Sequence, residues 1–183
     1  VSTGSSMGPV ISWKNRPWGN QYNDYCKSIK KIVVGKDITT VGVYTFYLCV
    51  NATEVTFEEG SKLERINSAA FCYLPYVKSV TIPDTVKYIN NTAFAYCESL
   101  VNVYVPQDVV YISESAFKNS GKAVLNVAEG TYGEKYAESE SISHIVREYE
   151  YAPVDSGSCG ENVTYTLYES GLMEISGTGD MED

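Results

Sequence analysis

Few residues of this chain have a type and a position that could do chemistry. The single histidine, His144, lies in a predicted strand without the spaced partners that a general base or a metal ligand needs. The stretches 155–157 and 157–160 place serine or cysteine beside glycine, but neither lies between a strand and a helix, where such nucleophiles are held. The sequence also lacks a glycine-rich phosphate loop and a calcium loop. We therefore predict no catalytic, cofactor-binding or metal site, and no enzyme.

The five cysteines are odd in number and lack the Cys-x-x-Cys spacing of metal sites. Cys49 and Cys97 each come three residues after a phenylalanine, where two other stretches have leucine and serine. A position that accepts all three residue types is a small inward-facing packing site. We therefore expect Cys49 and Cys97 to be buried, free thiols in the core. A disulfide between Cys26 and Cys159 is the one pairing that the sequence does not exclude.

These residues are positioned by a repeat of about two dozen residues. Phenylalanines recur at positions 46, 71, 94 and 117, in steps of 25, 23 and 23. The aliphatic residues at 41, 66, 89 and 112 recur in the same steps. Such a period is the signature of a solenoid, in which each unit buries its apolar side by stacking on its neighbours. The predicted core is a column of four rings, Phe46, Phe71, Phe94 and Phe117.

Each unit predicts two short strands and a turn. In one unit, residues 80–83 alternate and end on proline, and residues 86–89 form a second extended segment. Four residues before each phenylalanine stands a residue that turns the chain by adopting positive φ or by bonding its own backbone. These residues are Gly42, Asn67, Asn90 and Ser113. The two extra residues of the long step fall in the charged turn 58–62, where an insertion leaves the core register intact.

The flanks of the repeats predict caps. Residues 1–30 carry Trp13 and Trp18, which suit an amino-terminal cap over the open end of the stack; a ligand-binding aromatic pair is the alternative. After Phe117 the pattern decays, with Asn126 at the position that valine holds in earlier units. A short helix at 131–138 and a strand at 142–146 then predict the closing cap of a solenoid spanning 31–148.

Residues 149–183 predict a linker up to Gly160, followed by a β-hairpin with its turn at 169–171. Residues 175–181 match residues 1–7 at a constant offset of 174. We therefore expect the tail to begin another copy of the module and the chain to be a piece of a longer protein.

Charge and hydropathy exclude two classes of partner. The net charge of −9 argues against nucleic acid, and no run of eighteen apolar residues could span a membrane. No secretion signal is visible at the start. Six basic residues face two acidic ones up to Asp37, whereas thirteen acidic residues face two basic ones from Glu129 onward. This asymmetry is either solvated surface or the meeting of an acidic tail with a basic head.

One unit shows the complete repeat pattern: Val80-Thr-Ile-Pro-Asp-Thr-Val86-x-x-Ile89-x-x-x-Ala93-Phe94-x-x-Cys97-x-x-Leu100. It resembles the BspA-like leucine-rich repeats of bacterial cell-surface proteins. The closing helix, which contains Tyr132-Gly-Glu-Lys-Tyr-Ala137, and the segment 159–181 resemble the same family. The resemblance implies a right-handed solenoid of mostly β or α/β type with short parallel strands. It also implies export to the cell surface and attachment to host proteins or other cells, with no chemistry and no cofactor.

Equivalent positions of successive coils lie about 5 Å apart, so the outer side chains form columns. Three columns are rich in Tyr and Arg, the residue types enriched at binding hot spots. The alternative is that the tyrosines only stiffen the sheet. The candidate binding residues are Arg65, Tyr88 and Tyr111 in one column, Tyr73 and Tyr96 in a second, and Tyr104 with Thr56 and Thr81 in a third. Arg65 beside Tyr88 also predicts a cation–π pair.

Two functions follow as hypotheses. In the first, the chain is a secreted or cell-surface adhesion module that binds a protein or glycan of a host or neighbouring cell through the solenoid surface. In the second, it is a structural spacer of a tandem-module protein that self-associates head to tail through residues 159–183. Neither hypothesis involves nucleic acid, membrane insertion or a cofactor.

Overall fold

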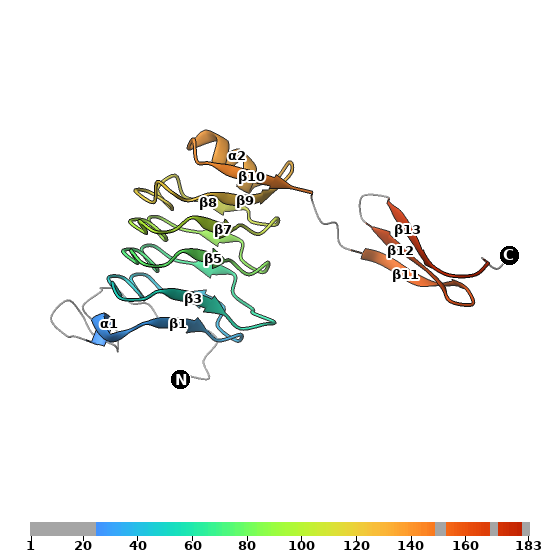
Figure 1. The fold of residues 1–183 in the computed structure, drawn as a ribbon, viewed down its shortest axis with the longest axis horizontal. Coiled ribbons are helices and arrows are strands. Elements are labelled where there is room, and N and C mark those ends of the chain that lie inside the picture. The colour runs from blue at the N-terminus through green and yellow to red at the C-terminus, as the bar shows by residue number, and fades with distance from the viewer. Residues whose placement is uncertain (1–24, 149–152, 169–171, 181–183) are drawn as a thin grey trace. The chain divides into compact units, whose positions relative to one another are not determined.

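The computed structural model describes residues 25–148, 153–168 and 172–180. The chain forms two compact units, Val1–Glu148 and Tyr149–Asp183. In the first unit, short strands lie one above another in successive coils (Figure 1). Trp13, Trp18 and residues 1–7 lie outside the described residues, so the predicted tryptophan cap is not described further.

Two columns of parallel strands build the first unit. The unit opens with helix α1 (Tyr25–Ser28) and closes with helix α2 (Tyr132–Ser139). One column holds β1 (Lys31–Val34), β3 (Glu54–Phe57), β5 (Ser79–Thr81), β7 (Asn102–Tyr104), β9 (Leu125–Ala128) and β10 (His144–Arg147). The other holds β2 (Thr40–Val41), β4 (Arg65–Ile66), β6 (Tyr88–Ile89) and β8 (Tyr111–Ile112), hydrogen-bonded in that order. Every pairing is parallel, so the predicted parallel-strand solenoid is confirmed.

A ladder of turns forms the third side of each coil. The Phe71 amide donates to the carbonyl of Ala93 in the next coil, and the Phe94 amide donates to that of Ala116, at 2.9 and 2.8 Å. The predicted turn positions are correct, because the carbonyl of Asn90 accepts from the Ala93 amide three residues on. Positive φ, one of the two alternatives for these positions, does not occur at them. It falls on residues two before the phenylalanine and two after it, namely Tyr44, Ala69, Thr92, Leu48, Tyr73, Tyr96 and Asn119.

The predicted column of rings is the centre of the core. The ring centroids of Phe46 and Phe71 lie 5.3 Å apart, those of Phe71 and Phe94 5.3 Å, and those of Phe94 and Phe117 5.5 Å. Their interplanar angles are 17°, 8° and 7°. Phe71, Phe94 and Phe117 are buried, whereas Phe46 is only half-buried. The stack therefore runs through at least four coils.

The carboxy-terminal coil keeps the pattern that the sequence analysis judged to decay. Val103 pairs with Leu125 and not with Asn126, and both Leu125 and Val127 are fully buried. The step between units shortens by one residue here, and the prediction for Asn126 was therefore one position out of register. Helix α2 then covers the end, where the Tyr136 ring lies 6.3 Å from that of Phe117.

The predicted insertion leaves the core register intact but interrupts a sheet. β1 pairs with β3, and β5 begins a separate sheet that continues through β7, β9 and β10, so β3 and β5 are not hydrogen-bonded neighbours. The turn 58–62 lies between β3 and its next coil, with Gly60 at φ 70°. The Lys62 ammonium pairs with Asp37, 2.7 Å away in the preceding coil. The insertion is thus absorbed in an exposed turn, as expected.

The second unit is a three-stranded antiparallel sheet. Its strands are β11 (Pro153–Gly160), β12 (Val163–Tyr168) and β13 (Met173–Gly177), paired in that order. The predicted hairpin corresponds to β12 and β13. The predicted linker is wrong from Pro153 onward, because those residues pair with β12. Its serines and glycines had indicated a loop, but the partner strand supplies the hydrogen bonds that hold them extended.

We predict that Phe94→Ala lowers the free energy of unfolding by about 3–5 kcal/mol, because it removes a buried ring that has a stacked neighbour on each side. Urea unfolding followed by circular dichroism measures this loss. Phe57→Ala is the control, since Phe57 is half-buried and meets Phe71 only edge-on, and it should cost clearly less. Equal losses for the two variants would contradict the central role of the stack.

The buried thiols should resist alkylation in the folded protein. Burial raises the pKa of the Cys97 thiol from 9.0 to about 12 and that of Cys72 to about 11, so both stay protonated and unreactive as the pH rises past 9. Iodoacetamide at pH 8.5 should therefore modify the part-exposed Cys159 first. Mass spectrometry identifies the modified residue. Modification of Cys97 as fast as in the denatured chain would show that its site opens.

Candidate binding surfaces

The first predicted column lies on the sheet of two-residue strands. β4, β6 and β8 place Arg65, Tyr88 and Tyr111 side by side in register. The Arg65 guanidinium carbon lies 3.9 Å from the centroid of the Tyr88 ring, which confirms the predicted cation–π pair. Tyr111 is 43% exposed, and no described residue hydrogen-bonds to its hydroxyl or to that of Tyr88. This column therefore presents a cation and two rings with unused phenolic groups.

The second predicted column lies on the turn side. The Tyr73 and Tyr96 rings are parallel, with centroids 4.4 Å apart, and both residues have positive φ. They pack against a small cluster of buried residues separate from the main core, made by Ala69, Cys72 and Ala95. Tyr44 and Tyr47, which the sequence analysis missed, pack against the same cluster. These rings cover apolar side chains, which is a structural role.

The third predicted column lies on β3, β5 and β7, and its Tyr104 contacts Arg147 from β10. The Tyr104 hydroxyl donates to Asp84, 3.1 Å away, and the Arg147 guanidinium carbon lies 4.4 Å from its ring centroid. Arg147 also donates through Nη2 to the carbonyl of Val105 at 3.0 Å. Its Nε and Nη1 are buried without a hydrogen-bond partner among the described residues. The sequence shows Arg147 only as a basic residue in a strand, so the analysis missed it.

A shallow groove of about 310 Å³ lies beside Tyr104. Its lining is mostly hydroxyl and amide side chains, together with the Arg147 guanidinium. The lining residues are Ser79, Val80, Thr81, Asn102, Tyr104, Asn126 and Arg147. In it the Asn126 amide donates to Asn102 at 2.6 Å, so the polar groups are ordered along the column.

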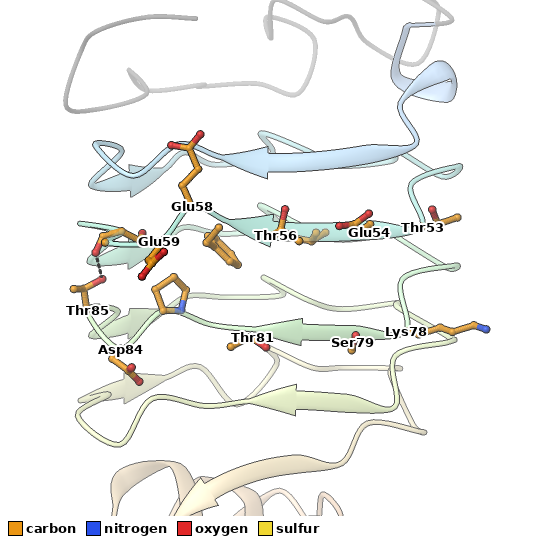
Figure 2. A pocket seen from close by; sticks show the side chains of 15 residues that line it. Thr53, Glu54, Thr56, Glu58, Glu59, Lys78, Ser79, Thr81, Asp84 and Thr85 are labelled. Atoms are coloured by element: carbon orange, nitrogen blue, oxygen red, sulfur yellow. Dashed lines mark hydrogen bonds between the residues drawn. The ribbon is translucent and has the colours of Figure 1, made fainter. Parts of the chain in front are cut away.

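A larger groove of about 630 Å³ lies where β3 and β5 are not hydrogen-bonded to each other (Figure 2). Figure 2 shows Glu54 and Thr56 along β3 and Ser79 and Thr81 along β5. Several of its carboxylates already have partners: Glu54 pairs with Lys31 at 2.7 Å, and Glu58 accepts from the Lys36 amide at 2.9 Å. The groove is open, and hydroxyl and carboxylate side chains line it together with Val55, Phe57 and Pro83. The sequence pointed to it only through the insertion 58–62.

The residues that could do chemistry are not brought together. The Nδ1 of His144 lies 3.1 Å from the carbonyl oxygen of its neighbour Ile142. The Ser158 hydroxyl donates to the carbonyls of Gly160 and Val163 within its own sheet, and the Asp155 carboxylate accepts from a tyrosine. In the described part of the chain, no group of three or more His, Cys, Asp or Glu side chains could hold a metal ion. Likewise, none of the described helices is both long and apolar enough to cross a bilayer.

The candidate binding residues thus fall on three separate sides of the coil. Arg65, Tyr88 and Tyr111 form one continuous surface. Tyr73 with Tyr96 and Tyr104 with Arg147 belong to the other two sides. One ligand of ordinary size would therefore engage one column and not all three.

One solved structure shares this architecture. The T. pallidum leucine-rich repeat protein matches 56% of this chain with a TM-score of 0.52 and 23% sequence identity, which shows a shared fold. A leucine-rich cell surface protein from Faecalibacterium prausnitzii aligns with 94% of this chain at a TM-score of 0.40 and 17% identity. The chain spans about half the length of each, covering 47% and 51% of them. No curated protein matches the sequence.

The family follows from the repeat itself. The profile of the BspA-type leucine-rich repeat region matches residues 19–132 in six copies, which is more than half of the chain. These residues cover the strands β1 to β9 and the ring stack described above. The leucine-rich repeat solenoid is typically a binding scaffold without enzymatic activity. The chain belongs to the BspA-type leucine-rich repeat family.

Proposed function

We propose that this chain is a recognition module, secreted or displayed at a cell surface, that attaches to a protein or glycan of a host or neighbouring cell. The observation that carries the proposal is the register of Arg65, Tyr88 and Tyr111 on β4, β6 and β8. Family membership supports the surface setting, because BspA-type repeats are commonly protein-binding surface modules. The proposal needs a surface for holding a partner and no reacting groups.

The column on the two-residue strands is the best supported of the three. Tyrosine and arginine carry much of the energy of protein interfaces because they combine large apolar area with polar tips. The Arg65 guanidinium is already ordered by the Tyr88 ring, so it would lose little freedom on binding. The rings of the other two columns are engaged, with Tyr73 packed on a small core and Tyr104 bonded to Asp84.

A second candidate function rests on the small sheet of the second unit. Alternation along β12 and β13 places one set of apolar side chains on the same face, in register. This apolar face consists of Val163, Tyr165, Leu167, Met173 and Ile175. Met173 and Ile175 are 53% and 51% exposed. A small sheet with one apolar face is stabilised by covering that face, which favours the spacer that self-associates through residues 159–183.

For recognition, we predict that the double variant Tyr88→Ala, Tyr111→Ala weakens attachment roughly tenfold or more while the melting temperature stays nearly unchanged, because neither ring belongs to the buried core. Beads coated with the chain are tested against a panel of extracellular matrix proteins and a glycan array. Tyr76→Ala is the matched control, since that tyrosine is exposed but lies outside the column. A folded double variant that attaches as well as the parent chain would refute the assignment of this column.

For self-association, we predict that the chain forms concentration-dependent oligomers and that Ile175→Lys abolishes them by placing a charge on the apolar face. Sedimentation velocity at low and high salt measures the effect. Association that survives salt indicates the apolar face, whereas association lost in salt indicates the acidic tail on the basic head. Glu174→Lys changes a charge on the opposite face of β13, so it should weaken association through the acidic tail and leave association through the apolar face unchanged. Monomers at every salt concentration would rule the spacer out.

A further inference from the structure

We propose that Cys26 and Cys49 form a disulfide in an oxidising compartment, and that this bond staples α1 to the first coil of the solenoid. Their Sγ atoms lie 3.5 Å apart. Both side chains are in the main core, with 3% and 0% of their surface exposed. The pair is separate from the binding columns, so this inference stands or falls independently of the proposed function.

Cys26 extends a column of equivalent positions by one coil. Cys49 is followed in this column by Leu74, Cys97 and Ser120, and Cys26 precedes it by 23 residues, the usual step. Backbones of neighbouring coils lie about 4.8 Å apart, within the Cα–Cα range of about 4.4–6.8 Å that disulfides accept. The sequence analysis left open only Cys26 with Cys159, because it assigned residues 1–30 to a cap and not to a coil.

Hydrogen bonds on the carboxy-terminal side of each cysteine hold the two segments together. The Asn51 side chain donates to the carbonyl of Lys27 at 2.7 Å, and the Thr53 amide donates to that of Lys30 at 2.9 Å. These contacts fix the residues after Cys26 against those after Cys49. The two sulfur atoms therefore meet because the chain around them is in register, and a change of side-chain torsion brings them to bonding distance.

The other cysteines lack this arrangement. Cys97 lies between Leu74 and Ser120 in the column, and its Sγ lies 3.4 Å from the carbonyl oxygen of Phe71. Cys72 lies in the separate cluster beneath the tyrosines. Among the described residues, the column that contains Cys49 thus brings two cysteines into neighbouring coils once, at Cys26 and Cys49.

The bond would form by thiol–disulfide exchange with a small disulfide such as glutathione disulfide. One cysteine thiolate attacks that disulfide, forms a mixed disulfide and releases one glutathione thiolate. The second cysteine thiolate then attacks the protein sulfur and releases the second glutathione. The two protein thiols lose two electrons and two protons in total, and the glutathione disulfide gains them.

The consequence is that α1, where the described part of the solenoid begins, cannot separate from the first coil while the bond is intact. α1 has only four residues and is not stable as an isolated helix. In a solenoid, each coil is held only by its neighbours, so the outermost coil opens most easily. A covalent link at Cys26 removes that opening when the chain is outside a reducing compartment, and reduction restores it.

The test refolds the unmodified 183-residue chain from denaturant in a mixture of reduced and oxidised glutathione, followed by acid quenching and mass spectrometry. We expect a mass loss of about 2 Da for two hydrogens and a linked peptide pair containing Cys26 and Cys49. The count of thiols titrated after unfolding should fall from five to three. The melting temperature should rise by several degrees and return on addition of dithiothreitol.

Variants sharpen the result. Cys26→Ser and Cys49→Ser should each abolish the linked pair and the rise in melting temperature. Cys97→Ser, the matched control from the same column, should keep both. The proposal is overturned if the refolded chain, with its native circular dichroism restored, retains five thiols in glutathione disulfide. It is equally overturned if Cys26 links to Cys159 or Cys72 instead.

Discussion

The structure depends on one constraint: each coil must place the same kind of residue directly over its equivalent in the coil before. Parallel pairing of Tyr88 with Arg65 and Tyr111 sets this register backbone to backbone. The same register brings Phe71, Phe94 and Phe117 into nearly parallel contact in the interior. Because a coil contacts only its neighbours, the core is a column and not a globule, and its ends must be covered. Tyr136 on α2 covers one end and lies next to Phe117.

The same register decides what the outside can do. An exposed position becomes a column of side chains about 5 Å apart, which suits an extended partner better than a small molecule. The three sides differ in how much of that column is available. Tyr73 and Tyr96 are occupied in covering Cys72 and its neighbours, and Tyr104 is occupied by Asp84 and Arg147. On the two-residue strands, Tyr111 is 43% exposed, and Arg65 and Tyr88 contact each other within the column.

The features that distinguish this solenoid from a uniform repeat lie where the period changes and at its ends. The two-residue insertion at 58–62 coincides with the break between β3 and β5 and with the larger groove. The shortened step before Leu125 brings the last coil under α2. At the amino-terminal end the regular 23-residue step is kept, and cysteine occupies the equivalent position in two neighbouring coils, which brings Cys26 to Cys49. A perfect repeat would have produced neither the break between β3 and β5 nor the shortened step.

The sequence by itself determined the period, the ring column, the two strands of each unit, the closing helix and the pairing of Arg65 with Tyr88. It could do so because a solenoid converts spacing along the chain directly into contact between coils. It could not place Arg147 over Tyr104, pair β11 with β12, or bring Cys26 beside Cys49. Arg147 and β11 lie after the repeats, where no period fixes a partner, so tertiary structure alone decided their contacts. Cys26 does stand one 23-residue step before Cys49, but only the structure showed that the segment around it packs in register with the first coil.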